Sequence, residues 1–199
     1  MSPTATTTLP PLPAPLTWDV EPASWSLDPL TIAAPPRCDL FHDPAGRPPE
    51  TAAPRLLGPV EGDFQLSARV RCTFDGAFDA GALLLWADDA RWVKLAFEVS
   101  PQGEPGVVSV ITDGLSDDAN AFAVTGDAVW LRISRLGPAI ALHGRLDGEP
   151  WRFVRHFALA GAELRAGFLA QSPTGEGATA RFDEIGFIPE RLADLRSGV

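Results

Sequence analysis

The sequence predicts an all-β protein built as a sandwich or a barrel, and three observations support this prediction. Short apolar or alternating runs recur roughly every 8–15 residues from Trp18 onward. The runs are separated by turn-forming segments such as Asp-Gly and Gly-Glu-Pro. No stretch between residues 16 and 188 has the periodicity of an amphipathic helix. Many short strands with dense turn signals are typical of sandwiches and barrels.

The expected strands fall into three groups along the chain. Short apolar runs between Pro- and Asp-containing segments predict strands at 16–20, 24–26, 30–34 and 38–42. Longer alternating runs between the turns EGD (61–63), FDGAFDAG (74–81), DDAR (88–91) and SPQGEPG (100–106) predict strands at 64–73, 80–86, 91–99 and 107–112. Runs bounded by LDGEP (146–150) and SPTGEG (172–177), among other turns, predict strands at 121–124, 128–135, 139–146, 151–157, 164–171 and 178–187.

A chain of 199 residues predicts one domain, which we place at 16–188. Residues 1–15 are rich in Pro and Thr and predict a disordered or extended arm. Residues 189–199 follow a proline and predict either a short helix or a loose tail. The expected core between two mostly antiparallel sheets comprises Phe64, Leu66, Leu83, Leu85, Val93, Leu95, Phe97, Leu131, Ile133 and Phe168.

The net charge of −10, with no basic run, argues against binding to nucleic acid or to an anionic membrane surface. The N-terminus lacks the basic and apolar regions of a secretory signal, and no 18-residue apolar run is present, so we expect a cytoplasmic protein. The Arg-, Ala- and Pro-rich but Lys-poor usage is typical of a GC-rich bacterial genome.

Cysteine and histidine offer no recognisable site. Cys38 and Cys72 do not form a disulfide framework, and two free thiols are the default expectation, with a single disulfide left open. The three histidines have no metal-ligand spacing, so no metal site is predicted. The chain also lacks a nucleophile elbow, a phosphate loop and a zinc-protease motif.

Lys94 is the only lysine beside fifteen arginines, and it lies in the expected strand 91–99. Strand alternation places Trp92, Lys94 and Glu98 on the face opposite the core. A row that combines an aromatic, a cation and a carboxylate is typical of a binding surface. The alternative is a surface ion pair of little energetic value, with Trp92 covered by a neighbouring loop.

Several motifs occur in the order found in one family. They are Asp39-x-Phe41, Asp79-x-Gly81, Trp92-x-Lys94-x-x-x-Glu98, Ser109-Val110-x-Thr112-x-x-x-Ser116-Asp117, Asp147-Gly148-x-x-Trp151 with Arg155-x-Phe157, and Gly167-x-x-Ala170-x-Ser172-Pro173. Over residues 16–188 this pattern resembles the DUF1349 family, which implies a concanavalin A-like β-sandwich of jelly-roll type. The chain departs from the family at His143–Gly148, where the family usually has Ser before Asp-Gly, and at Asp118, where an aromatic often follows Ser-Asp.

On this fold, the resemblance implies a concave sheet face that often binds sugars. Strand 151–157 places Arg155 among aromatic residues, where a buried guanidinium needs a carboxylate partner. We therefore predict a non-catalytic binding domain for a carbohydrate or another small polar metabolite on the concave face. The predicted ligand-binding residues are Trp92, Lys94, Glu98, Arg155, Asp39 and Asp117, the charged members forming one cluster or, equally, a structural ion-pair network.

Three alternatives stay open. A glycosidase-like enzyme could use Glu98, but the E-x-D-x-x-E strand of glucanases on this fold is absent, so no catalytic residue is assigned. The second alternative is a regulatory protein-interaction module or a homodimer, and flat outer sheets and the N-terminal arm would be compatible with either. The resemblance also suggests a regulatory role, because the family includes a fungal protein named for regulation of enolase. No cofactor is predicted, although the fold often carries a structural Ca²⁺, and the oxygen-rich loops 43–46 and 116–120 are candidate sites without calcium-loop spacing.

Overall fold

The computed structural model describes residues 6–160 and 163–199, which contain seventeen β-strands and no helix. One sheet has eight strands in the order β1-β2-β7-β16-β9-β10-β11-β12, with bounds Thr6–Thr7, Leu16–Val20, Arg55–Val60, Leu164–Gln171, Ala80–Asp88, Arg91–Val99, Pro105–Asp113 and Leu115–Ala123. The other has seven strands in the order β15-β14-β13-β8-β17-β4-β3, with bounds Arg152–Ala158, Ala139–Arg145, Ala128–Leu136, Phe64–Cys72, Ala178–Ile188, Leu30–Ala34 and Trp25–Leu27. A small hairpin pairs β5 (Leu40–Phe41) with β6 (Glu50–Thr51).

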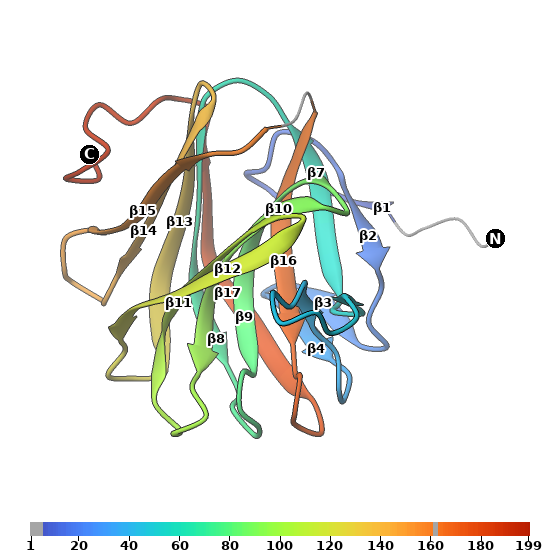
Figure 1. Ribbon diagram of the computed structural model, residues 1–199. Coiled ribbons are helices and arrows are strands. Elements are labelled where there is room, and N and C mark those ends of the chain that lie inside the picture. The colour runs from blue at the N-terminus through green and yellow to red at the C-terminus, as the bar shows by residue number, and fades with distance from the viewer. Residues whose placement is uncertain (1–5, 161–162) are drawn as a thin grey trace.

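The two large sheets lie face to face as two layers, and every strand pair within them is antiparallel (Figure 1). All ten predicted core residues are buried between the layers. The predicted fold class, an all-β sandwich with two antiparallel sheets, is confirmed.

The sequence analysis missed β7 and most of β12. Gly58 and Pro59 interrupt the apolar run of β7, so this strand looks like a turn. Strand β12 lies at the edge of its sheet and most of its side chains are exposed, so it lacks an alternating pattern. Polar residues on an edge strand discourage pairing with other chains, which explains the composition of β12.

Close packing of neighbouring strands explains one glycine of the family motifs. A Cβ atom at Gly167 in β16 would lie 1.9 Å from the carbonyl oxygen of Leu56 in β7. No side chain fits at that distance, so glycine is required wherever these two strands keep this approach.

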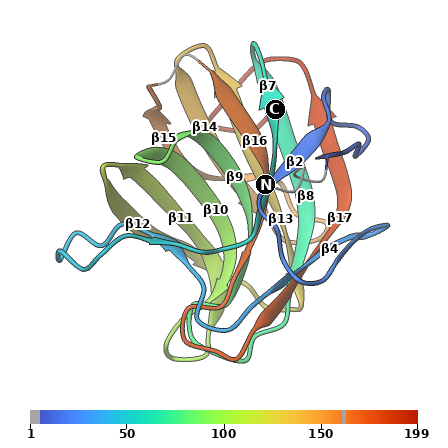
Figure 2. The same cartoon turned by 90° about the vertical axis from the view of Figure 1, so that its right-hand side faces the viewer.

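The eight-stranded sheet has a second apolar layer on the face turned away from the core, which we call the pocket face. Leu84, Trp92 and Leu169 on this face pack with Leu40 and Ala53 of the segment that carries β5 and β6. Figure 2 shows this segment, residues 36–54, crossing the strands of the sheet. The segment therefore covers part of the pocket face and leaves the rest open.

Both ends of the described chain pack on the sandwich. Leu9 and Leu12 of the N-terminal arm join the core. The C-terminal segment forms a turn beside β13, β14 and β15 rather than the predicted helix or loose tail (Figure 1). Arg132 donates a 2.7 Å hydrogen bond to the carbonyl of Gly198, and Leu192 packs in a separate apolar cluster on this sheet.

Cys38 and Cys72 are both free, which settles the alternative left open for them. Within the described residues, no helix is long and apolar enough to cross a membrane.

Candidate functional site

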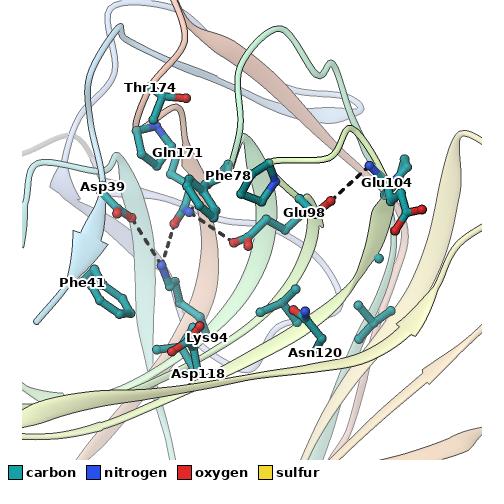
Figure 3. A pocket seen from close by; sticks show the side chains of 18 of the residues that line it. Asp39, Phe41, Phe78, Lys94, Glu98, Glu104, Asp118, Asn120, Gln171 and Thr174 are labelled. Carbon is teal, nitrogen blue, oxygen red and sulfur yellow. Dashed lines mark hydrogen bonds and ion pairs between the residues drawn. The ribbon is translucent and has the colours of Figure 1, made fainter. Parts of the chain in front are cut away.

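The pocket face holds a cavity of about 730 Å³ beside the β5–β6 segment (Figure 3). Its floor comes from β10, β11 and β12, and its rim comes from the segments around residues 37–50, 100–106 and 171–174. Small-molecule sites in proteins commonly have volumes of about 300–1,000 Å³, so this cavity is of suitable size for a small ligand.

Lys94 lies on the floor of this cavity with only 1% of its surface exposed. Its Nζ atom donates a 2.7 Å hydrogen bond to Oε1 of Gln171 and lies 3.5 Å from Oδ1 of Asp39. The ammonium also lies 5.7 Å from the ring centroid of Trp92. A compact ammonium fits between these groups, whereas the wide planar guanidinium of arginine needs more room. The enclosed position gives a physical reason for the single lysine.

Gln171 links the two charged residues of β10. Its Nε2 atom donates to the carbonyl of Phe78 at 3.0 Å and lies 3.5 Å from Oε2 of Glu98. Both Glu98 and Gln171 pair in register with Ala80 of the intervening strand β9. Because the alanine side chain is short, the two longer side chains can approach each other above it.

Glu98 has an altered affinity for its proton. Burial raises the pKa of its carboxyl from 4.5 to about 7, Lys94 opposes this rise, and Asp39 and Asp118 add to it. The carboxyl group therefore changes its protonation state close to neutral pH.

An aromatic side chain at the cavity comes from a position that the sequence analysis did not select. Phe78 lines the cavity with 39% of its surface exposed, and its backbone has a φ angle of 68°. This left-handed conformation is uncommon for a bulky residue and marks a position held by its surroundings. The available signal was a phenylalanine inside the turn segment FDGAFDAG, where small and polar residues dominate.

Trp92, the aromatic expected to face solvent, is fully buried and does not line the cavity. His42 of the covering segment packs edge-on against it, with ring centroids 5.7 Å apart. The predicted exposed row is therefore corrected at Trp92, and the alternative of a covering loop holds there. Trp92 lies beside Lys94 on the pocket face, between the sheet and the covering segment.

The structure divides the predicted charged cluster in two. Lys94, Glu98 and Asp39 come together at the cavity. Asp117 instead forms a 3.0 Å ion pair with Arg155, and neither residue lines the cavity. Adjacent residues of a strand point to opposite faces, so Asp118 lines the cavity whereas Asp117 does not. Asp118 is the position where the chain departs from the family motif.

The calcium suggested by the fold does not fit the loops considered for it. Asp43 accepts hydrogen bonds from the backbone N–H of Ala45 and from Arg47, and Asp117 is paired with Arg155. These carboxylates are already neutralised or hydrogen-bonded. Within residues 6–160 and 163–199, no group of three His, Cys, Asp or Glu residues is arranged to hold a metal ion.

Comparison with known proteins agrees with the geometry of the fold. The structure defines a concanavalin A-like β-sandwich of the kind also seen in proteins of glycoside hydrolase family 43. The model described as "Protein of unknown function (DUF1349)" matches residues 18–189, and the chain belongs to this family.

A curated sequence and a solved structure, both from yeast, are similar to the chain. Regulation of enolase protein 1 of Saccharomyces cerevisiae is 27% identical over 93 residues, which is 46% of each chain, so the alignment spans about half of that relative. A crystal structure of a functionally unknown protein from Saccharomyces cerevisiae has a TM-score of 0.81 and 21% identity, covering 89% of this chain and 97% of that one.

The fold also resembles part of a larger protein. The GH43 protein BlXynB of Bacillus licheniformis has a TM-score of 0.69 and 13% identity, covering 88% of this chain but 37% of that one. At this identity the similarity concerns the fold alone.

Proposed function

We propose that this protein is a non-catalytic binding domain whose cavity takes a carbohydrate or a similarly hydroxylated small ligand. The observation that carries the proposal is the pairing of an exposed aromatic ring with a fixed polar row. Phe78 offers an apolar surface to the C–H face of a sugar ring. Lys94 and Glu98, both linked to Gln171, offer a donor and an acceptor for hydroxyl groups.

Preorganisation supports this proposal. Gln171 is fixed by three groups, namely the Lys94 ammonium, the Phe78 carbonyl and the nearby Glu98 carboxyl. Polar groups that are already held in place lose little conformational freedom when a ligand binds. A polar floor without a ligand-sized cavity would instead suggest a structural network only, and the cavity of about 730 Å³ favours the binding function.

A thermal-shift screen with mono- and oligosaccharides tests the proposal. A ligand at one hundred times its Kd adds about 2.7 kcal/mol of stability, which raises the Tm of a chain of this size by roughly 5–10 °C. Phe78→Ala should weaken binding about tenfold, equivalent to about 1.4 kcal/mol. Leu115→Ala is the matched control, because Leu115 is exposed but does not line the cavity. An equal loss of saccharide affinity in Phe78→Ala and Leu115→Ala would contradict the proposal. The absence of any Tm shift with saccharides would contradict it as well.

A glycosidase-like enzyme is the second candidate, favoured by the pKa of about 7 at Glu98. A carboxyl group that titrates near neutral pH is suited to general acid–base catalysis. Release of nitrophenol from aryl glycosides, abolished in Glu98→Gln, would replace the binding proposal with this one. The name of the yeast relative favours a third candidate, a cytoplasmic regulatory module that acts through a protein partner or as a homodimer.

A further inference from the structure

The charged groups around the cavity are strongly unbalanced. Six carboxylates line it, contributed by Asp39, Asp43, Glu50, Glu98, Glu104 and Asp118. Among the described residues, the lining contains only three cationic side chains, Arg37, Arg47 and Lys94. A cleft with a surplus of one charge raises the local concentration of ligands of the opposite charge.

The three cations are already engaged. Arg47 pairs with Asp43, and Arg37 pairs with Glu176 outside the lining. Both arginine side chains are largely exposed at the rim. Lys94 is enclosed by Gln171 and Asp39. An anionic ligand would therefore meet, among the described residues of the lining, no cation that lacks a carboxylate neighbour.

Several carboxylates of the lining are not neutralised. Within the described part of the chain, Asp118, Glu50 and Glu104 form no ion pair. The carboxyl of Glu98 has one side-chain neighbour at hydrogen-bond distance, the amide of Gln171 at 3.5 Å. Asp118 and Asn120 lie two residues apart on β12 and both line the cavity, so they share a face of the strand.

A second observation points independently to a ligand at this place. The Lys94 ammonium has three N–H donors, but only two side-chain acceptors are within hydrogen-bond distance in the described residues. Its side chain is 98% buried and lines the cavity, so the remaining donor has a partner only if a ligand or solvent supplies one. The cavity thus combines a hydrogen-bond donor, the Lys94 ammonium on its floor, with hydrogen-bond acceptors, the unpaired carboxylates of its lining.

We propose that the ligand is a sugar bearing a protonated amino group, and that the cavity discriminates against phosphorylated and carboxylated sugars. This inference rests on the proposed function and specifies its substrate class. The ammonium of the ligand would be held by the carboxylate of Asp118, and a carboxyl oxygen of Glu98 would accept a further hydrogen bond from it. Its hydroxyl groups would meet Lys94 and Gln171, and the face of its ring would contact Phe78.

NMR titrations with pairs of monosaccharides that differ in one group test this inference. The pairs are glucose with glucosamine, galactose with galactosamine and mannose with mannosamine, and glucose 6-phosphate is the anionic probe. At about pH 6 and low salt, we expect one amino sugar to bind at least tenfold more tightly than its neutral counterpart. Glucose 6-phosphate should not bind.

Two neighbouring carboxylates provide a matched pair of variants. Asp118→Asn should abolish the tenfold preference for the amino sugar, whereas Asp117→Asn, which changes the charge equally on the opposite face, should preserve it. Equal loss of the preference in both variants would indicate general attraction to an acidic protein and would overturn the inference. Equal binding of amino and neutral sugars would overturn the amino-group inference but keep the proposed function. Absence of binding by every sugar would overturn both.

Discussion

The protonation of Glu98 gives a quantitative prediction for the variant Glu98→Gln. The folded protein retains the proton of this carboxyl up to about pH 7, whereas the unfolded chain releases it near the ordinary pKa of 4.5. Because the folded state binds more protons between these values, stability should fall as the pH rises from about 5 to 8. Glutamine resembles the protonated form, so the variant should not show this contribution.

The magnitude follows from the pKa difference. A change from 4.5 to about 7 corresponds to roughly 3 kcal/mol at about 1.36 kcal/mol per pH unit. Glu98 is partly exposed to the cavity, and solvent screening reduces this to about 2 kcal/mol. We therefore expect Glu98→Gln to match the wild type near pH 4.5 and to be about 2 kcal/mol more stable at pH 8. For a chain of this length the Tm at pH 8 should rise by about 4–8 °C.

Urea denaturation of both proteins at several pH values between about 4.5 and 8 measures this difference. The comparison of variant with wild type removes the contributions of all other titrating groups. A difference in unfolding free energy that does not change with pH would refute the assignment of the raised pKa to Glu98. A variant less stable than the wild type at pH 8 would show that the ionised carboxylate stabilises the cavity.

Three further predictions concern packing. Lys94→Met should lower the unfolding free energy by about 2–4 kcal/mol, since it leaves the half-buried carboxylate of Asp39 without its cation. Lys94→Arg should cost about 1–3 kcal/mol through overpacking. An unfolding free energy equal to that of the wild type in both variants, measured by urea denaturation, would contradict the enclosed position of the ammonium. Gly167→Ala should destabilise by about 3 kcal/mol, because its Cβ would lie 1.9 Å from the Leu56 carbonyl oxygen; an unchanged Tm would show that the two strands can separate without cost. Gly198→Ala should release the C-terminal segment from the sheet, since the added Cβ would lie 2.7 Å from the Cβ of Trp151 and the backbone φ angle of this residue is 77°. We expect faster amide hydrogen exchange confined to that segment. Unchanged exchange would contradict the packing of the segment on the sheet.

The candidate site could be predicted only in part. Alternation within 91–99 correctly separated Val93, Leu95 and Phe97 from Lys94 and Glu98, because a strand has a fixed period of two. The same pattern could not show that Trp92 is covered, since the covering segment lies some fifty residues earlier in the chain.

Long-range pairing also decided which acidic residue faces the cavity. Asp117 and Asp118 are equivalent in composition, and strand β12 was not predicted at their position. The register of β12 against β11 pairs Asp118 with Val110, whose side chain lines the cavity, and so turns Asp117 toward Arg155. A shift of one residue would exchange these two carboxylates.

The sequence by itself determined the all-β class, the ten core residues and the special position of Lys94, because these depend on local periodicity and residue chemistry. The tertiary structure alone decided that Phe78 and Gln171 join Lys94, and that Arg155 does not. The physical reason is that a cavity forms where separate strands and loops meet, and its contacts depend on strand order and register rather than on neighbouring residues in the chain.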